Sequence, residues 1–309
     1  MTTLTLSNKV NGDSIFERLS FTSALLILVT LSGILLSLID GGWPAFKEFG
    51  PGFVFHNVWD PIRGQFGAAS AIYGTLVTSL IAIIIAVPIA LGTAIFLAEL
   101  APKWVSVPVS KAIELLAAIP SIIYGMWGLF VFSPWFSNGF QTWAGQHLIE
   151  IPIIGPWFNG PPIGIGLLTA GIILSFMILP IMTSLTRDAL KSIPNVLREA
   201  AYGTGATPFE VITKVLIPKV KNATVSAGIL GLGRALGETM AVAFVIGGAN
   251  RIETSFFMPA ASISSTIAQQ FNEATDPTHI ASLIALGVVL FFITFFVMGF
   301  ARRLVGKAS

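Results

Sequence analysis

Six long apolar segments constrain the fold of this 309-residue chain more than any other feature of its sequence. A helix needs about 20 mostly apolar residues to cross the hydrocarbon core of a bilayer. The segments that reach this length are 19–39, 72–98, 112–132, 163–185, 224–246 and 280–301. Only 10% of the residues are charged, against roughly 25% in soluble proteins. The sequence therefore predicts an all-α membrane protein with six transmembrane helices.

The positive charges indicate how these segments are oriented. The N-terminal stretch, the second and fourth loops and the C-terminal stretch together hold thirteen of the seventeen Lys and Arg residues. The remaining loops hold three, and Arg234 alone lies inside a span. Because cytoplasmic loops carry an excess of Lys and Arg, both ends of the chain are predicted to lie in the cytoplasm.

The loops also suggest how the chain is divided. The outer loops, 40–71 and 133–162, are rich in Gly, Pro and aromatic residues. Aromatic residues near the ends of spans usually form interfacial belts, and a docking surface for an external partner is the alternative. We expect residues 1–70 to form an N-terminal transmembrane helix with its outer loop. Residues 71–302 are expected to form a core of five transmembrane helices that contains the cytoplasmic loop 187–221.

The cytoplasmic loop 187–221 has the pattern of a helix, a glycine turn and a second helix. Pro194 suits the first turn of a helix, and good helix formers follow it until Gly203 and Gly205 permit a sharp turn. Apolar residues then recur at helical spacing, namely Phe209, Ile212, Val215 and Leu216. This part of the chain is predicted to lie at the cytoplasmic face.

One run in this loop resembles the EAA loop of ABC importer permeases. Its matching residues are Glu199, Ala200, Ala201, Gly205, Val215, Ile217 and Pro218, at the spacing of that motif. The resemblance implies that Glu199, Ala200, Ala201 and Gly205 belong to a coupling helix and its turn, which dock into the ATP-hydrolysing subunit. The alternative is a helical hairpin that only stabilises the cytoplasmic face.

Two charged residues lie inside the fifth predicted span. A charge at the centre of a membrane helix costs roughly 2.5 to 3.5 kcal/mol on the mildest scale, so Arg234 and Glu238 must face protein or water. Residues four apart share one face of a helix, and the pair is therefore either a structural clamp or a site for an anion. In the second case Arg234 offers a planar fork of donors to phosphate or sulfate oxygens. Glu238 accepts a hydrogen bond from a protonated phosphate.

Two longer runs are similar to the PstC-type permease subunits of bacterial phosphate ABC importers, and the likeness covers nearly the whole chain. The runs are 231–242, which contains Arg234 and Glu238, and 114–129. This resemblance implies a permease bundle of the type I ABC importer class in the bacterial inner membrane. It also implies a heterodimer with a homologous A-type permease subunit, two ATP-binding subunits and a periplasmic phosphate-binding protein.

The third predicted span carries a charge and a proline of its own. Glu114 lies three residues after Lys111, close enough to pair with it on a helix, and this pairing is the expectation. Pro120 either allows the helix to bend during gating or produces a permanent kink.

The predicted function is that of a permease that is not itself an enzyme. The chain has no cysteine and only three scattered histidines, so no catalytic or metal site is expected. Its glycines around residue 231 are followed by no Gly-Lys-Ser/Thr, hence ATP is expected to be bound by a separate chain. Alternatives are a permease for another oxyanion, an ion-driven anion transporter with Glu238 as a proton relay, and a non-transporting membrane component.

Overall fold

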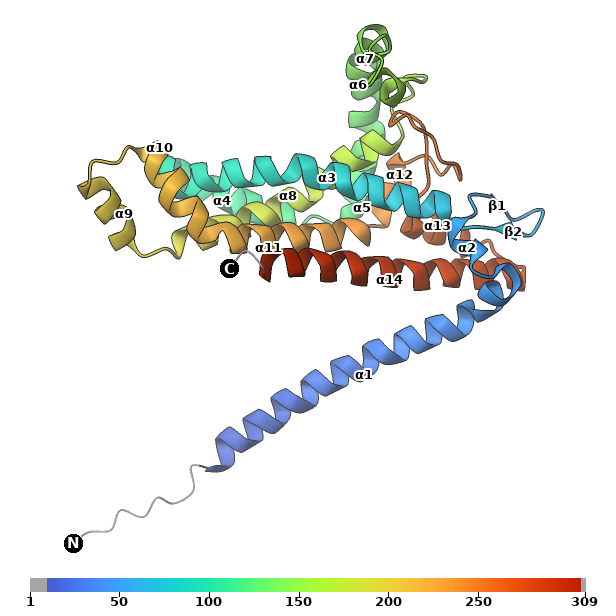
Figure 1. Cartoon of the computed structure of the whole chain (residues 1–309), viewed down its shortest axis with the longest axis horizontal. Helices are drawn as coiled ribbons and strands as arrows, with labels where there is room; N and C mark the ends of the chain where they lie inside the picture. The colour runs from blue at the N-terminus through green and yellow to red at the C-terminus, as the bar shows by residue number, and fades with distance from the viewer. Residues whose placement is uncertain (1–9, 307–309) are drawn as a thin grey trace.

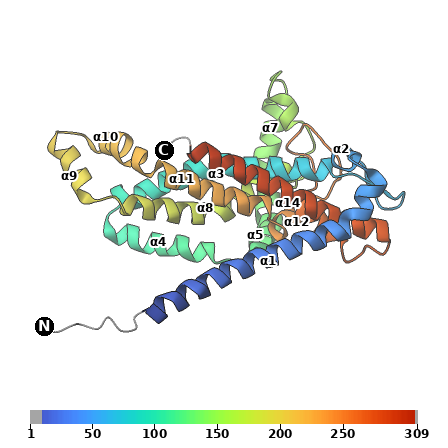
Figure 2. The ribbon, with the colours of Figure 1, turned by 60° about the horizontal axis from the view of Figure 1, so that its bottom comes forward.

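The computed structural model describes residues 10–306, and this part of the chain is mainly helical. Four long helices lie side by side as the body of the bundle (Figure 1). They are α3 (Ala69–Ile95), α8 (Leu167–Lys191), α11 (Ile217–Leu236) and α14 (Pro277–Gly306). A fifth helix, α1 (Val10–Phe49), packs on α14 with its C-terminal part, while its N-terminal part points away from the bundle (Figures 1 and 2).

Shorter elements complete the described part of the chain. The helices are α2 (Gly52–Phe55), α4 (Lys103–Ala117), α5 (Ser121–Trp127), α6 (Ser133–Phe136), α7 (Thr142–His147), α9 (Asn195–Gly203), α10 (Pro208–Glu210), α12 (Met240–Val245) and α13 (Ile263–Gln270). Wider π-helical turns occupy Phe96–Leu100, Gly128–Phe132, Ser137–Gln141 and Val211–Leu216, and a 3₁₀ turn occupies Gly155–Phe158. The strands β1 (Trp59–Asp60) and β2 (Gln65–Phe66) pair antiparallel, with Trp59 opposite Phe66.

The described helices agree with most of the predicted spans. Four helical stretches are long and apolar enough to cross a membrane: Gly12–Phe49, Ala69–Leu100, Leu167–Lys191 and Pro277–Arg303. A fifth is added if Lys103–Ala117 and Ser121–His147, which meet at an angle of 95°, form one span. The remaining predicted span, 224–246, is divided between α11 and α12. The count of six spans therefore stays a prediction.

Pro120 marks the sharpest break in the bundle. It has an extended backbone, with ψ at 138°, and stands directly before α5. A proline has no N–H to donate and disfavours helical geometry in the residue before it, so α4 ends at Ala117. The structure thus contains a kink at this proline, whereas Pro88 and Pro180 lie inside the unbroken helices α3 and α8.

The main core lies where α3, α8 and α12 meet. Small side chains of α3, such as Ala82 and Ala86, are fully buried against larger ones of α8, such as Ile173 and Leu174. Small residues allow helix backbones to approach closely in a membrane. The strongest packing of the bundle is therefore between α3 and α8, and the other elements are attached around this pair.

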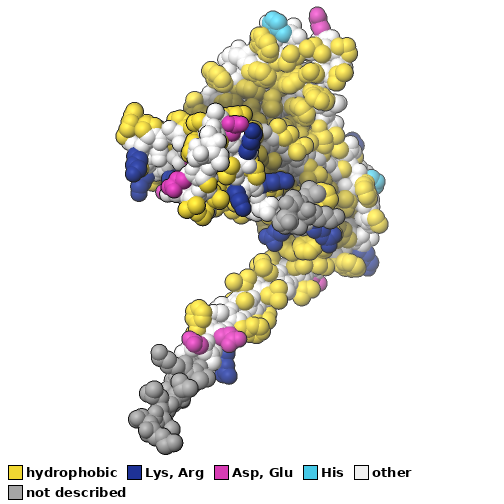
Figure 3. All heavy atoms as spheres, turned by 60° about the vertical axis from the view of Figure 1, so that its left-hand side comes forward, with side chains coloured by type: hydrophobic (Ala, Val, Ile, Leu, Met, Phe, Trp, Pro, Cys, Tyr) yellow, Lys and Arg dark blue, Asp and Glu magenta, His cyan; other side chains and the backbone are white. Residues whose placement is uncertain are grey.

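The two ends of the bundle carry different structures. Helices α9 and α10 of the loop 187–221 lie at one end, and the β1–β2 hairpin lies at the other (Figure 1). The described ends of α1 and α14 point toward the α9 end, as the predicted topology requires. No residue of the most apolar 18-residue stretch of α1 is buried, and hydrophobic side chains follow this helix (Figure 3). Its surface is suited to lipid or to another membrane chain.

Candidate anion site and coupling loop

The fifth predicted span is interrupted between its two charged residues. Helix α11 ends at Leu236, Gly237 follows it, and α12 begins at Met240. The amide of Glu238 donates to the carbonyl oxygen of Ala235, while the Glu238 side chain turns toward α12. Its Oε1 accepts a hydrogen bond of 3.2 Å from the amide of Ala241. Glu238 therefore satisfies one of the free donors at the start of α12.

Arg234 lies in the last turn of α11 and is exposed. In the described part of the chain it makes no hydrogen bond and no ion pair, including none with Glu238. The expectation that both residues share one helix face was wrong, because the helix ends between them. An intramolecular clamp between the two is accordingly absent from residues 10–306.

A second helix break lies at Pro120, directly before α5. The Tyr124 hydroxyl of α5 donates to the carbonyl oxygen of Leu116 at 2.9 Å, across this kink. Helix α5 approaches α12 closely because Gly125 has no side chain: a Cβ there would lie 2.9 Å from the Cα of Ala241. The helices that follow the two breaks, α5 and α12, thus pack directly against each other.

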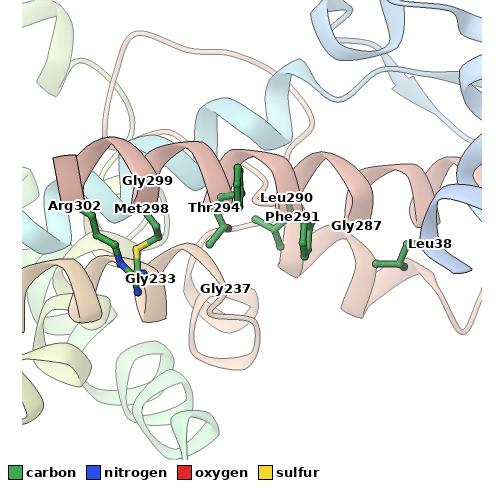
Figure 4. A pocket seen from close by; sticks show the side chains of 11 residues that line it. Leu38, Gly233, Gly237, Gly287, Leu290, Phe291, Thr294, Met298, Gly299 and Arg302 are labelled. Atoms are coloured by element: carbon green, nitrogen blue, oxygen red, sulfur yellow. The ribbon is translucent and has the colours of Figure 1, made fainter. Parts of the chain in front are cut away.

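The glycines around Arg234 contact two different neighbours. A Cβ on Gly231 would lie 2.9 Å from Met182 Sδ of α8, so Gly231 allows the close approach that the sequence suggests. Gly233 and Gly237 instead line a groove of about 550 Å³ between α11 and α14. Figure 4 shows Arg302 at one end of this groove and Leu38 near the other. Its lining is mostly apolar, and Arg234 is not part of it.

The cytoplasmic loop folds as its sequence predicts. Helix α9 is followed by Gly205, whose φ of +86° lies in the left-handed region that favours glycine. Nothing lies within 4 Å of a Cβ at this position, so the requirement is conformational rather than steric. Thr207 and Glu210 then form a capping box at the start of α10. The Lys214 ammonium and the hydrogen bonds from Thr207 lower the pKa of Glu210 to about 2.

The matched motif residues face mostly outward. Glu199, Ala200 and Gly205 are exposed, and Ala201 is partly buried against the cytoplasmic apolar cluster. Three large side chains around them are also exposed, to 70% at Val196, 50% at Tyr202 and 74% at Phe209. Phe209 therefore differs from Leu216, which is buried as the helical spacing suggests. The result is an exposed surface with apolar side chains at the end of the molecule.

Two arginines at this end have partners that the sequence did not indicate. Arg187 donates to Glu114 at 2.9 Å and to Asp188 at 2.8 Å. The expected pairing of Glu114 with Lys111 was wrong, because α4 packs against α8 and brings Glu114 to Arg187 while Lys111 remains exposed. No local pattern in the sequence indicates this pair, because its two residues are 73 positions apart.

Arg198 makes the second unanticipated pair, with Glu99. Its Nη2 and Nε donate to the two oxygens of Glu99 at 2.7 and 3.1 Å. Both side chains are mostly buried, with exposed fractions of 16% and 13%. The hydrogen bonds with Glu99 raise the pKa of Arg198 further above its usual range, against the opposing effect of burial.

Comparison with known proteins adds the following similarities. Residues 86–309 match the model of the family described as binding-protein-dependent transport system inner membrane component. The phosphate transport system permease protein PstC of Mesorhizobium japonicum is 49% identical over 94% of this chain and 89% of its own. Its counterpart in Haemophilus influenzae is 47% identical, over 96% and 93%. That of Pasteurella multocida is also 47% identical, over 97% and 94%.

Solved structures share the fold. A bacterial alginate ABC transporter in complex with an alginate-bound periplasmic protein gives a TM-score of 0.59 at 18% identity, over 96% of this chain and 99% of that one. The MetNI methionine ABC transporter in an inward-facing conformation gives 0.55 at 21% identity, over 77% and 94%. The helical arrangement is therefore that of an ABC importer permease of type I.

Proposed function

Because this chain belongs to the family of binding-protein-dependent transport system inner membrane components, we propose that it is the membrane-spanning permease subunit of an ATP-driven phosphate importer. Its PstC relatives align with nearly the whole chain, so the likeness extends to the N-terminal helix and the outer loops. The chain is a multi-pass protein of the inner membrane. Residues 71–302 act as the permease core, and residues 1–70 add a helix and an outer loop.

Arg234 is the residue that we place in the path of phosphate. The observation that carries this assignment is that an arginine inside a predicted span is exposed and has no partner in the described residues. An isolated charge is tolerated in a membrane only where it faces protein, a ligand or water. Its planar fork matches two phosphate oxygens, and it stays charged at any pH of the cell.

Glu238 completes this candidate site. Its hydrogen bond to Ala241 uses Oε1, and a carboxylate has a second oxygen with acceptor capacity. That oxygen accepts the hydrogen of a singly protonated phosphate, which a fully ionised sulfate does not have. The residue therefore favours phosphate over sulfate, whereas Arg234 binds either anion.

The coupling role belongs to α9 and its turn. Glu199, Ala200 and Ala201 dock into a groove of the ATP-hydrolysing subunit, and Gly205 reverses the chain beneath them. The exposed positions of Glu199 and Ala200 support this role, as do the exposed apolar side chains of Val196 and Tyr202. A hairpin that only stabilised the bundle would instead bury these side chains.

The permease requires partners for the rest of the cycle. It pairs with a homologous A-type permease subunit as a heterodimer, and a periplasmic phosphate-binding protein delivers the substrate. Two ATP-binding subunits bind and hydrolyse ATP, so this chain needs no cofactor and performs no catalysis itself. Closure of those subunits around ATP moves α9, and the pore then alternates between outward and inward access.

Uptake by the reconstituted assembly tests the anion site. We expect Arg234→Gln to lower ATP-dependent phosphate uptake by about 100-fold, since charge-assisted hydrogen bonds contribute about 1.5 to 3 kcal/mol. Arg234→Lys should recover part of the uptake, because an ammonium lacks the bidentate fork. Membrane abundance and recovery of the ATPase should stay normal in both variants.

The matched control is Arg63→Gln, which removes an exposed arginine from the outer loop. Normal uptake by the double variant Arg234→Gln with Glu238→Gln would reject the site. Uptake driven by a proton gradient without ATP would instead support the ion-driven transporter. Equal inhibition of labelled phosphate uptake by sulfate and by unlabelled phosphate would support a general oxyanion permease.

A further inference from the structure

Helix α9 is attached to the bundle by one of its faces. None of its residues is fully buried, and within Asn195–Gly203 only Arg198 and Ala201 are not exposed. Residues three apart lie on the same side of a helix. Any force that a docked ATPase applies to α9 therefore reaches the bundle through this face or through the chain on either side of it.

Arg198 makes specific polar contacts from that face. A guanidinium has five N–H donors, and all five have acceptors here. Nε and one Nη2 donor bind Glu99, and the second Nη2 donor binds the carbonyl oxygen of Leu190 at 2.8 Å. The Nη1 donors bind the carbonyl oxygen of Ile193 at 2.7 Å and Oδ1 of Asn195 at 3.4 Å.

Four of the five hydrogen bonds lead to the ends of the two helices that form the main core or to the chain just beyond them, and the fifth, to Asn195, stays within α9. Glu99 lies in the π-helical turn Phe96–Leu100, which continues α3, and such turns often occur at functional sites. Leu190 lies in the last turn of α8, and Ile193 lies two residues beyond the end of this helix at Lys191. A single side chain thus joins the coupling helix to α3 and α8 together.

From this geometry we propose that Arg198 is the positioning residue that transmits displacement of α9 to the cytoplasmic ends of α3 and α8. The proposal rests on the assignment of α9 as the coupling helix. Four of the five hydrogen bonds leave α9, for Glu99, Leu190 and Ile193, so α9 cannot shift without breaking them unless the ends of α3 and α8 follow it. The apolar contact at Ala201 has no directional bonds and allows sliding.

The pair between Arg187 and Glu114 provides a matched comparison. It also joins an arginine to a glutamate near this end of the bundle, at 2.9 Å. It links α8 to α4, however, and none of its hydrogen bonds involves α9. Loss of Glu114 leaves Arg187 paired with Asp188. Glu114→Gln therefore removes a similar interaction without disconnecting the coupling helix.

The test is the ratio of phosphate imported to ATP hydrolysed by the complete reconstituted assembly. We expect Arg198→Lys and Glu99→Gln to lower this ratio by roughly fivefold or more, the usual lower range of coupling between sites. ATP hydrolysis, membrane abundance and recovery of the ATPase should remain near those of the unmodified chain. Glu114→Gln should leave the ratio unchanged.

A second pair of variants keeps the test decisive if the first are poorly recovered. Because the chain has no cysteine, Glu99→Cys with Arg198→Cys creates a site for a bis-maleimide of short span, in an assembly whose other subunits are free of reactive thiols. Cross-linking should raise the transport ratio of this variant toward the normal value. A ratio that stays low after cross-linking would contradict the proposal.

Other outcomes would also overturn the proposed role of Arg198 in transmission. An unchanged ratio in Arg198→Lys would show that five-point contact is unnecessary. A ratio that falls only in parallel with loss of bound ATPase would assign Arg198 to docking rather than transmission. Failure of the proposed function itself is separate, since the unmodified assembly would then show no ATP-dependent phosphate uptake.

Discussion

The cytoplasmic end of the bundle and its middle place an arginine in opposite surroundings. Arg198 at the end is mostly buried, and its five donors all have acceptors. Arg234 in the middle is exposed and has no hydrogen bond within the described residues. The first charge is neutralised inside the chain and holds elements together. The second has no such partner in residues 10–306 and is exposed.

The glutamates follow the same division. Glu99 directs both carboxylate oxygens to Arg198. Within the part of the chain that the structure describes, the Glu238 carboxylate accepts only from the amide of Ala241. Each comparison involves one arginine and one glutamate, so residue types alone do not separate structure from function. What separates them is whether the two charges meet. This depends on the helix break at Gly237 and on the fold that brings Arg198 of α9 to Glu99 in the turn Phe96–Leu100.

Removing the acidic residue should give the largest difference in stability between the two regions. Glu99→Ala leaves the Arg198 charge mostly buried and without its carboxylate, and we expect a loss of about 3 to 5 kcal/mol in the free energy of unfolding. Glu238→Ala removes one helix cap and should cost about 1 kcal/mol. Denaturant titration of the purified chain in detergent measures both. Equal costs would contradict the division between the regions.

The close contact in the middle can be disturbed without touching a charge. In Gly125→Ala the new methyl group would lie 2.9 Å from the Cα of Ala241, so α5 or α12 must shift. We expect a cost of about 1 to 3 kcal/mol from overpacking and a loss of uptake, because Glu238 caps α12 through the amide of Ala241 and a shift of this helix would move the candidate site. Gly139→Ala is the control, since nothing lies within 4 Å of its Cβ. Normal uptake by Gly125→Ala would show that this contact does not position the site.

A modest effect on stability, smaller than that of Glu99→Ala, is expected in the turn after α9. Gly205 has a φ of +86° and open space around it, so Gly205→Val should cost about 1 to 2 kcal/mol through backbone strain alone. We expect reduced recovery of the ATPase with the permease, because the turn sets the position of α9. Gly203→Ala, which adds a methyl group at an equally open position of α9, should have little effect. Equal ATPase recovery for both variants would count against a requirement for the left-handed turn.

Local sequence patterns predicted the features that depend on neighbouring residues. Four of the apolar segments correspond to long helices, and the glycine turn after α9 has the backbone conformation that its residues suggest. The break at Pro120 has a local cause as well, although the sequence left open whether it would be a permanent kink. In each case the determining contacts lie within one or two helical turns.

Pairings across the fold could not be obtained in the same way. Arg198 and Glu99 are 99 positions apart, and Glu114 and Arg187 are 73 apart. Nothing near Glu114 in the sequence favours Arg187 over Lys111, because the choice depends on which face of α4 meets α8. The Arg234–Glu238 spacing was misleading for a related reason, since a four-residue interval places side chains together only in an unbroken helix.

The sequence by itself determined that this chain is a membrane protein of long helices with a basic cytoplasmic loop, because apolar length and charge position are properties of single segments. It also contained the coupling motif and the two charges of the fifth span. Only the tertiary structure decided that Arg198 is held by Glu99 while Arg234 has no partner among residues 10–306. The physical reason is that the state of a charge depends on the groups that packing brings within hydrogen-bonding distance, and packing joins segments that are far apart along the chain.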